Sequence, residues 1–339
     1  MSIRPVKMSS QSRPTMEGAG VHLHRVFGFG DTTPFDPFLM MDDFRNDNPA
    51  HYKNGFPWHP HRGIETITYV LKGTVDHGDS LGNQGTLSGG DIQWMTAGSG
   101  IIHQEMPHGN AAGEMHGFQL WANLPASQKM TTPRYQDIKS NEITELHDDD
   151  DSRIRIIAGN YRGYQGPVDG IAAEPQYLDI TLPPNCFKVF PFDTRRQGFA
   201  YIFEGSASFS NASSPFGVKV EKEFGGEEIE IRDLSGNRTL VLFGDGDEVS
   251  VISGDQGVRF LLISGAPLKE PVAWHGPIVM NTQAELQQAM RELNNGTSLK
   301  PAPTVGRYSK LPITSRFCGA TIYAKNSGAR HSPYHHHRG

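Results

Sequence analysis

The chain has 339 residues, of which 36% are hydrophobic and 20% charged, and its formal net charge is −6 at pH 7. This length suits two globular domains, and the acidic balance argues against direct binding of nucleic acid. The only cysteines, Cys186 and Cys318, stand far apart, which argues against disulfides and thiolate metal sites and favours a reducing compartment. No apolar run is long enough to span a bilayer and no signal core precedes the first domain, so we expect a cytoplasmic protein without a membrane partner.

Short strands and tight turns dominate the pattern of the first half. Residues 1–20 are polar and predict a flexible N-terminus, and residues 21–135 form the first predicted domain. Within it lie a nearly unbroken β-branched and aromatic run at 64–71 and further candidate strands at 91–95 and 117–122. Glycine and proline are frequent and spread out, as in proteins with many turns. The spacing predicts an antiparallel sandwich or barrel.

Histidines and carboxylates recur at alternate positions in two segments of this domain. His59 and His61 are two residues apart, as are His103 and Glu105, so each pair points to one face of a strand. Glu65 shares the parity of the first pair. Three imidazoles and two carboxylates on neighbouring strands can surround one ion. Such nitrogen and oxygen donors suit Fe, Mn, Ni, Cu or Zn and do not choose among them.

The second half repeats the first without its ligands. Residues 136–170 contain an acidic run and a Gly/Tyr stretch, and we interpret them as an interdomain bridge. The strand pattern resumes in the second predicted domain, residues 171–299, where Phe199–Gly205 resembles Thr68–Gly73. No histidine and carboxylate pair precedes this strand at the matching spacing. The sequence therefore predicts one metal-binding domain and one structural or regulatory domain.

One helix is predicted near the end of the second domain. Thr282 and Glu285 have the spacing of a capping box, apolar residues follow at helical intervals, and Asn294–Gly296 ends the pattern. The final segment, 300–339, is rich in Pro, Ser and Gly and predicts a flexible tail.

Six motifs together resemble the pirin family of the cupin superfamily. They are Asp36–Leu39, His59–Gly63, Gln93–Gly98, His103–Pro107, Phe118–Pro125 and His275–Thr282. They occur in order between about residues 20 and 300, across both halves. The resemblance implies a bicupin, with two antiparallel β-barrel domains, a short C-terminal helix and metal in the N-terminal barrel only. The polar stretch 211–237 and the tail depart from the family pattern.

The resemblance places the family's metal ligands at His59, His61, His103 and Glu105, with Fe(II) as the expected ion. Many other cupins use a carboxylate of the first motif, which is Glu65 here, but the His-x-Glu of the second motif favours Glu105. Glu65 and Gln119 are then expected beside the ligands. Because a carboxylate can both bind a metal and accept a proton, Glu105 is also the candidate catalytic base.

The resemblance implies two competing functions. The first is a metal-dependent dioxygenase that opens flavonols such as quercetin. The alternative is a metal- or redox-responsive regulator that acts through a protein partner. It would be either a transcriptional co-regulator or a modulator of metabolic enzymes. In a eukaryote, the co-regulator would also be expected in the nucleus. An inert storage-type bicupin is disfavoured, because the ligand set is intact in one half and lost in the other.

Overall fold

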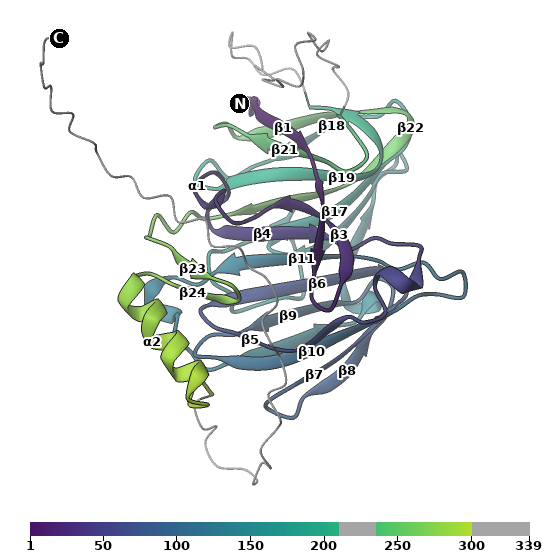
Figure 1. Ribbon diagram of the computed structural model, residues 1–339. Coiled ribbons are helices and arrows are strands. Elements are labelled where there is room, and N and C mark those ends of the chain that lie inside the picture. Colours follow the sequence, from purple (N-terminus) through teal and green to yellow (C-terminus); the bar gives the residue numbers. More distant parts are fainter. Residues whose placement is uncertain (210–234, 300–339) are drawn as a thin grey trace, which may run out of the picture. The chain divides into compact units, whose positions relative to one another are not determined.

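The computed structural model describes residues 1–209 and 235–299, most of which belong to antiparallel β-sheets (Figure 1). The predicted all-β fold is confirmed. The tail at 300–339 and most of the stretch at 211–237 lie outside the described residues. Within the described ranges, no helix has the length and apolar character needed to cross a membrane.

The N-terminal domain is a barrel made of two facing sheets. The larger sheet has seven strands in the order β12 (Arg134–Ile138), β9 (Ile92–Thr96), β6 (Ile64–Lys72), β11 (His116–Asn123), β4 (Phe38–Asp43), β3 (Val21–Phe27) and β2 (Arg13–Glu17). The smaller sheet has four strands in the order β5 (Phe56–His61), β10 (Ile101–His108), β7 (Thr74–Asp79) and β8 (Gln84–Leu87). Val70 of the larger sheet and Val75 of the smaller sheet share one buried cluster, so the two inner faces close on each other.

A nine-stranded sheet forms the C-terminal domain. Its path is β1 (Val6–Gln11), β21 (Thr239–Phe243), β19 (Gln197–Ser208), β22 (Glu248–Gly265), β17 (Gln176–Leu182), β14 (Arg153–Ala158) and β13 (Thr144–His147), with β18 (Phe187–Pro191) paired to β22 and β20 (Ser235–Gly236) paired to β19. The register between β19 and β22 shifts twice, and such bulges bend strands round a core. That core is apolar and includes Ile180, Phe190, Ile202 and Phe260.

The two domains pack together through one apolar layer. Ile67, Trp94 and Phe118 of the seven-stranded sheet lie in the same buried cluster as Tyr177 and Leu261 of the nine-stranded sheet. Because side chains alternate along a strand, the odd positions of β6 face this layer and its even positions face the interior of the first barrel. One sheet therefore supports both the domain interface and the barrel interior.

The short elements are α1 (Thr32–Phe35), the 3-10 turns Pro49–His51, Ala126–Gln128 and Ser140–Glu142, and the hairpins β15 (Asn160–Tyr161) with β16 (Tyr164–Gln165) and β23 (Ala273–His275) with β24 (Ile278–Met280). The predicted helix is α2 (Gln283–Asn294), which lies beside the β23–β24 hairpin (Figure 1). Its capping box is confirmed: the Thr282 hydroxyl accepts from the amide of Glu285, and the Glu285 carboxylate accepts from the amide of Thr282.

The prediction of a flexible N-terminus is wrong. β1 pairs with β21 of the C-terminal sheet, and β2 pairs with β3 of the N-terminal domain. Arg4 anchors the segment: it is 2% exposed, and its guanidinium donates to the carbonyls of Gly244, Asp193 and Arg196 at 2.9–3.0 Å. The strand partner lies more than 200 residues away in the chain, so no local pattern reveals it.

The prediction that residues 136–170 form an interdomain bridge also needs correction. Only part of 136–170 connects the domains, because β12 completes the seven-stranded sheet while β13 and β14 belong to the nine-stranded sheet. Ile154 and Ile156 of β14 are fully buried in the C-terminal core. We therefore propose that the C-terminal domain begins with β13.

Arg4→Ala is expected to lower the free energy of unfolding by about 3 kcal/mol, because three partly buried carbonyls lose a charged donor. Urea unfolding measures the change. Arg13→Ala is the matched control, since Arg13 is exposed on β2, and it should stay within about 0.5 kcal/mol of the parent chain. Equal stability of both variants would contradict an anchored N-terminus.

Candidate metal centre

Three histidines converge inside the N-terminal barrel. β5 carries His59 and His61, and the adjacent antiparallel strand β10 places His103 directly opposite His59. The ring centroids lie 4.4 Å apart for His59 and His103, 4.8 Å for His59 and His61, and 4.9 Å for His61 and His103. One ligand atom from each ring lies within 4.8 Å of the others. The strand parity predicted from sequence therefore brings all three imidazoles together.

The hydrogen bonds of these rings are incomplete. The Nδ1 atom of His59 lies 2.9 Å from the carbonyl oxygen of Pro57, so its N–H donates there and Nε2 keeps its lone pair. Neither ring nitrogen of His61 or His103 has a hydrogen-bond partner, although both rings are buried. Buried polar atoms are nearly always paired. A cation between the rings would satisfy the free lone pairs.

The three imidazoles are held in the neutral form. Burial is the main cause that lowers the pKa of His59, and the nearby Glu105 carboxylate opposes this effect. Burial also lowers the pKa values of His61 and His103, and the neighbouring imidazoles lower them further. Neutral imidazole is the form that binds metals. The cluster thus fits a divalent transition-metal ion.

Glu105 lies at the edge of this cluster. Its Oε2 atom is 3.9 Å from Nε2 of His103, and its side chain is almost fully buried. Two side chains of the facing sheet hold the carboxylate: Thr68 of β6 lies 2.9 Å from Oε1, and Nε2 of Gln119 on β11 donates to Oε2 at 3.2 Å. The Thr68 hydroxyl also lies 2.7 Å from the Gln119 side-chain oxygen, and its single hydrogen serves one acceptor at a time.

Thr68→Val is expected to weaken metal binding about 10- to 100-fold, because a group that orients a ligand is lost while the side-chain volume is kept. Competition with a chelator of known affinity measures the change. Thr144→Val is the matched control on β13, where the hydroxyl donates to the carbonyl of Gln165. Equal affinity of both variants would show that Thr68 does not orient Glu105.

The structure does not place Glu65 beside the histidines. β5 ends at His61 and the chain turns at Gly63, whose φ is +76°, before β6 begins. Glu65 points to the domain interface, the face of β6 that also carries Ile67. There Thr96 donates to its carboxylate at 2.7 Å, and burial raises the pKa of Glu65. Parity of residue number predicts a shared face only within one strand, and the turn breaks it.

Two buried basic side chains hold the turn after His61. Arg62 forms an ion pair of 2.9 Å with Glu292 of α2 and donates to the carbonyl of Ser298 at 2.8 Å. Lys129 donates to the carbonyl of Gly63 at 2.8 Å. A Cβ atom at Gly63 would lie 1.9 Å from the Val279 carbonyl oxygen, so only glycine fits there. The C-terminal helix is thereby tied to the strand that carries two of the histidines.

Lys129 predicts a pH effect on stability. Burial lowers its pKa to about 7, against an ordinary value of 10.5. The folded protein therefore binds fewer protons than the unfolded chain between these values, and stability rises with pH across that window. Relative to Lys129→Met, the unmutated chain should gain about 3 kcal/mol of unfolding free energy from about pH 7 to 9.5. Urea unfolding with chelator at both pH values measures it, and parallel slopes would contradict the assignment.

Aromatic side chains connect His61 with the surface. The Trp121 ring meets the His61 ring edge-on at 5.0 Å, Trp274 follows at 6.0 Å from Trp121, and Phe29 lies 5.1 Å from Trp274. Phe29 is 69% exposed. These rings come from three segments far apart in the chain, so no local sequence pattern indicates that they form one aromatic wall beside the histidines.

Two β-barrels with a three-histidine cluster in the first define a bicupin that carries a candidate metal centre. The family model described as Pirin matches residues 20–122, and that of the Pirin C-terminal cupin domain matches residues 177–298. The chain belongs to the pirin family.

Relatives support this membership over nearly the whole domain pair. A pirin-like protein of Caulobacter vibrioides is 39% identical over 297 residues, which are 87% of this chain and 99% of the relative. A Pseudomonas aeruginosa protein, whose name assigns quercetin 2,3-dioxygenase activity provisionally, is 40% identical over 84% of this chain and 94% of its own length. The crystal structure of an Acinetobacter baumannii quercetin 2,3-dioxygenase superposes with a TM-score of 0.75 at 28% identity, covering 88% of this chain and 99% of that chain.

Proposed function

We propose that this protein is a flavonol dioxygenase of the quercetin 2,3-dioxygenase type, with one Fe(II) ion bound by His59, His61, His103 and Glu105. The observation that carries the proposal is the set of three neutral, clustered imidazoles with a buried carboxylate beside them. The names of relatives that span both domains support the substrate class.

When bound, the metal would supply Lewis-acid chemistry toward the substrate and dioxygen. The protein side chains do the rest. Glu105 accepts the proton of the flavonol enol hydroxyl, and Thr68 and Gln119 keep its carboxylate turned toward the histidines. The rings of Trp121 and Trp274, tilted by 42° to each other, offer an apolar wall for an aromatic substrate.

Metal content and quercetin consumption, measured on one sample of untagged protein, test the proposal. The protein is assayed first without oxygen and then with it, and carbon monoxide release is recorded. One metal per chain with metal- and oxygen-dependent consumption supports the dioxygenase. One metal per chain without consumption would instead favour the redox-responsive regulator, and a search for protein partners would follow.

A further inference from the structure

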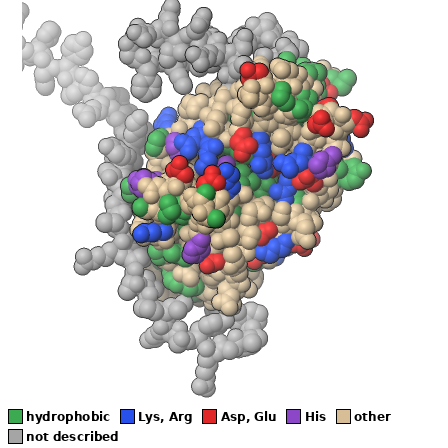
Figure 2. Space-filling view, turned by 90° about the vertical axis from the view of Figure 1, so that its right-hand side faces the viewer, with side chains coloured by type: hydrophobic (Ala, Val, Ile, Leu, Met, Phe, Trp, Pro, Cys, Tyr) green, Lys and Arg blue, Asp and Glu red, His purple; other side chains and the backbone are tan. Residues whose placement is uncertain are grey.

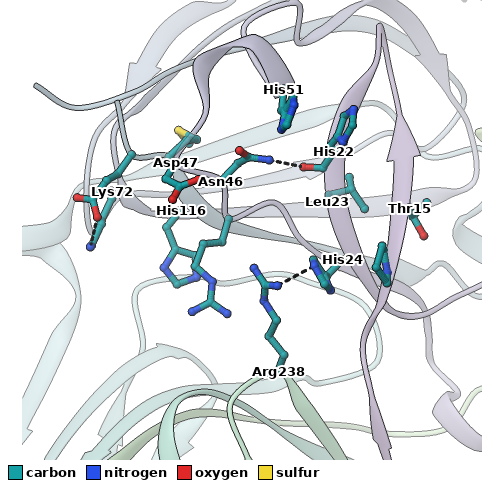
Figure 3. A pocket seen from close by; sticks show the side chains of 14 residues that line it. Thr15, His22, Leu23, His24, Asn46, Asp47, His51, Lys72, His116 and Arg238 are labelled. Carbon is teal, nitrogen blue, oxygen red and sulfur yellow. Dashed lines mark hydrogen bonds and ion pairs between the residues drawn. The ribbon is translucent and has the colours of Figure 1, made fainter. Parts of the chain in front are cut away.

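A second cavity, of about 500 Å³, lies where the two domains meet (Figure 3). Side chains from β2, β3, the loop after β4, the start of β11 and the turn before β21 line it. None of the four proposed metal ligands takes part. The cavity is therefore separate from the metal centre and calls for its own chemistry.

Cations of both domains meet in this cavity. Arg238 of the C-terminal domain donates from Nη1 to Nε2 of His24 at 2.7 Å (Figure 3). Because this acceptor is a neutral imidazole, the bond does not neutralise the guanidinium charge, and the buried carboxylate that feels Arg238 is Asp43. Arg45 of the N-terminal domain reaches across the interface to the C-terminal domain, where its guanidinium donates hydrogen bonds to the carbonyl of Phe203 at 2.9 Å and to the amide oxygen of Asn237 at 3.0 Å. The Nε atoms of both arginines are buried without a hydrogen bond.

Nearby cations act on the imidazoles of this cavity. Burial and then the surrounding cations, with Arg45 the first of them, lower the pKa of His116 to about 2, and burial and Arg238 lower the pKa of His24. His116 is only 3% exposed, and its Nε2 atom makes no hydrogen bond. β3 lies toward the side of Figure 1 that Figure 2 turns to the front, and Lys and Arg side chains lie across the middle of that face, interspersed with Asp and Glu.

The acidic groups around the cavity are largely committed elsewhere. Glu114 pairs with Lys72 at 3.1 Å. Asp43 is fully buried behind the lining residues, accepts from Arg45 and from the Tyr201 hydroxyl, and lies 3.6 Å from Nε2 of His116. Asp47, the other lining carboxylate, is solvent-exposed, where water screens its charge. Asp43 thus faces two guanidinium groups and pairs directly with Arg45, so the two arginines together keep positive charge available to a ligand.

We propose that this cavity binds a small organic anion through carboxylate or phosphate oxygens, and that Arg238 is its principal contact. The volume lies in the range of small-molecule sites. Oxyanions form short, charge-assisted bonds with guanidinium groups. A ligand bound to Arg238 would touch both domains at once, since Arg238 is the C-terminal residue in a cavity otherwise lined by the N-terminal domain. The proposal is independent of flavonol chemistry.

Calorimetric titration of the full chain with inorganic phosphate and, separately, with citrate tests the proposal, with chloride added to keep the ionic strength constant. We expect saturable binding of one anion per chain. Tighter phosphate binding points to a phosphate ester as the ligand, and tighter citrate binding points to a carboxylate. Arg238→Gln should weaken the preferred anion at least about tenfold. Lys72→Gln, a change at a half-exposed side chain, serves as a second variant that leaves the fold intact and should weaken binding less.

Two controls keep this test decisive. Arg195→Gln removes an exposed arginine of the C-terminal domain and should leave the affinity unchanged. His103→Ala removes a proposed metal ligand and should also leave it unchanged. The proposal is overturned if neither anion binds saturably, if Arg238→Gln and Lys72→Gln both bind like the parent chain, or if His103→Ala abolishes binding, since the anion would then occupy the metal centre.

Discussion

His103→Ala is expected to abolish stoichiometric metal binding and to reduce quercetin consumption by more than about 100-fold. His103 is fully buried, and its ring lies within 5 Å, centroid to centroid, of both other imidazoles. Loss of a group that only orients a ligand costs about 10- to 100-fold, so loss of a ligand should cost more. Metal analysis after gel filtration and the quercetin assay measure both effects.

The fold of this variant should survive, because the apolar layers of the two domains do not include His103. Circular dichroism and thermal unfolding in the presence of chelator check this, since bound metal would itself raise the unfolding temperature of the parent chain. His147→Ala is the matched control, as His147 is 70% exposed and paired with Glu145. Full activity of His103→Ala would remove the three-histidine centre from the mechanism.

The histidine cluster could be predicted because its information is local. His59 and His61 share a face within one strand, and so do His103 and Glu105. Only one long-range fact was needed, the pairing of β5 with β10, and the order of the motifs implied it. The capping box of α2 was predictable for the same reason, since both partners lie within one turn.

Other parts of the molecule depend on contacts that sequence spacing does not encode. Arg4 binds carbonyls about 190 to 240 positions along the chain, so a polar N-terminus resembled a flexible one. The Lys129 amine donates to the carbonyl of Gly63, which lies 66 residues earlier in the chain. The prediction that Glu65 lies beside the histidines is wrong for a different reason. Glu65 has the same odd-number parity as His59 and His61, but the turn at Gly63 separates their strands, so Glu65 lies in another sheet and on another face.

The position of Glu65 separates two carboxylates that the sequence left in competition. Glu105 lies beside His103 and is held by side chains of the facing sheet, whereas Glu65 is bonded to Thr96 at the domain interface. Residues of the larger sheet thus serve the two carboxylates in different ways. Thr68 and Gln119, which point into the barrel, orient Glu105, the candidate base, whereas Thr96 binds Glu65 at the domain interface. Isosteric substitution of each carboxylate can distinguish these roles.

Glu105→Gln is expected to reduce quercetin turnover by about 100- to 10,000-fold, the range that a general base contributes. The amide keeps the volume and one oxygen acceptor for Thr68, so the barrel should remain folded. It cannot accept the substrate proton at neutral pH, and it is a weaker metal ligand than a carboxylate. Metal content, kcat and KM measured on the same preparation separate these causes, because a lost base lowers kcat even when the metal is retained.

Glu65→Gln is the matched control, since it makes the same chemical change at another almost fully buried carboxylate of the same domain. Its Thr96 bond can persist to the amide oxygen, and it touches none of the histidines, so turnover should stay within about threefold of the parent chain, a change below 1 kcal/mol in activation free energy. The reverse order, with an active Glu105→Gln and an inactive Glu65→Gln, would transfer the carboxylate role to Glu65. Equal, small effects of both would leave the three histidines as the only protein groups that the chemistry requires.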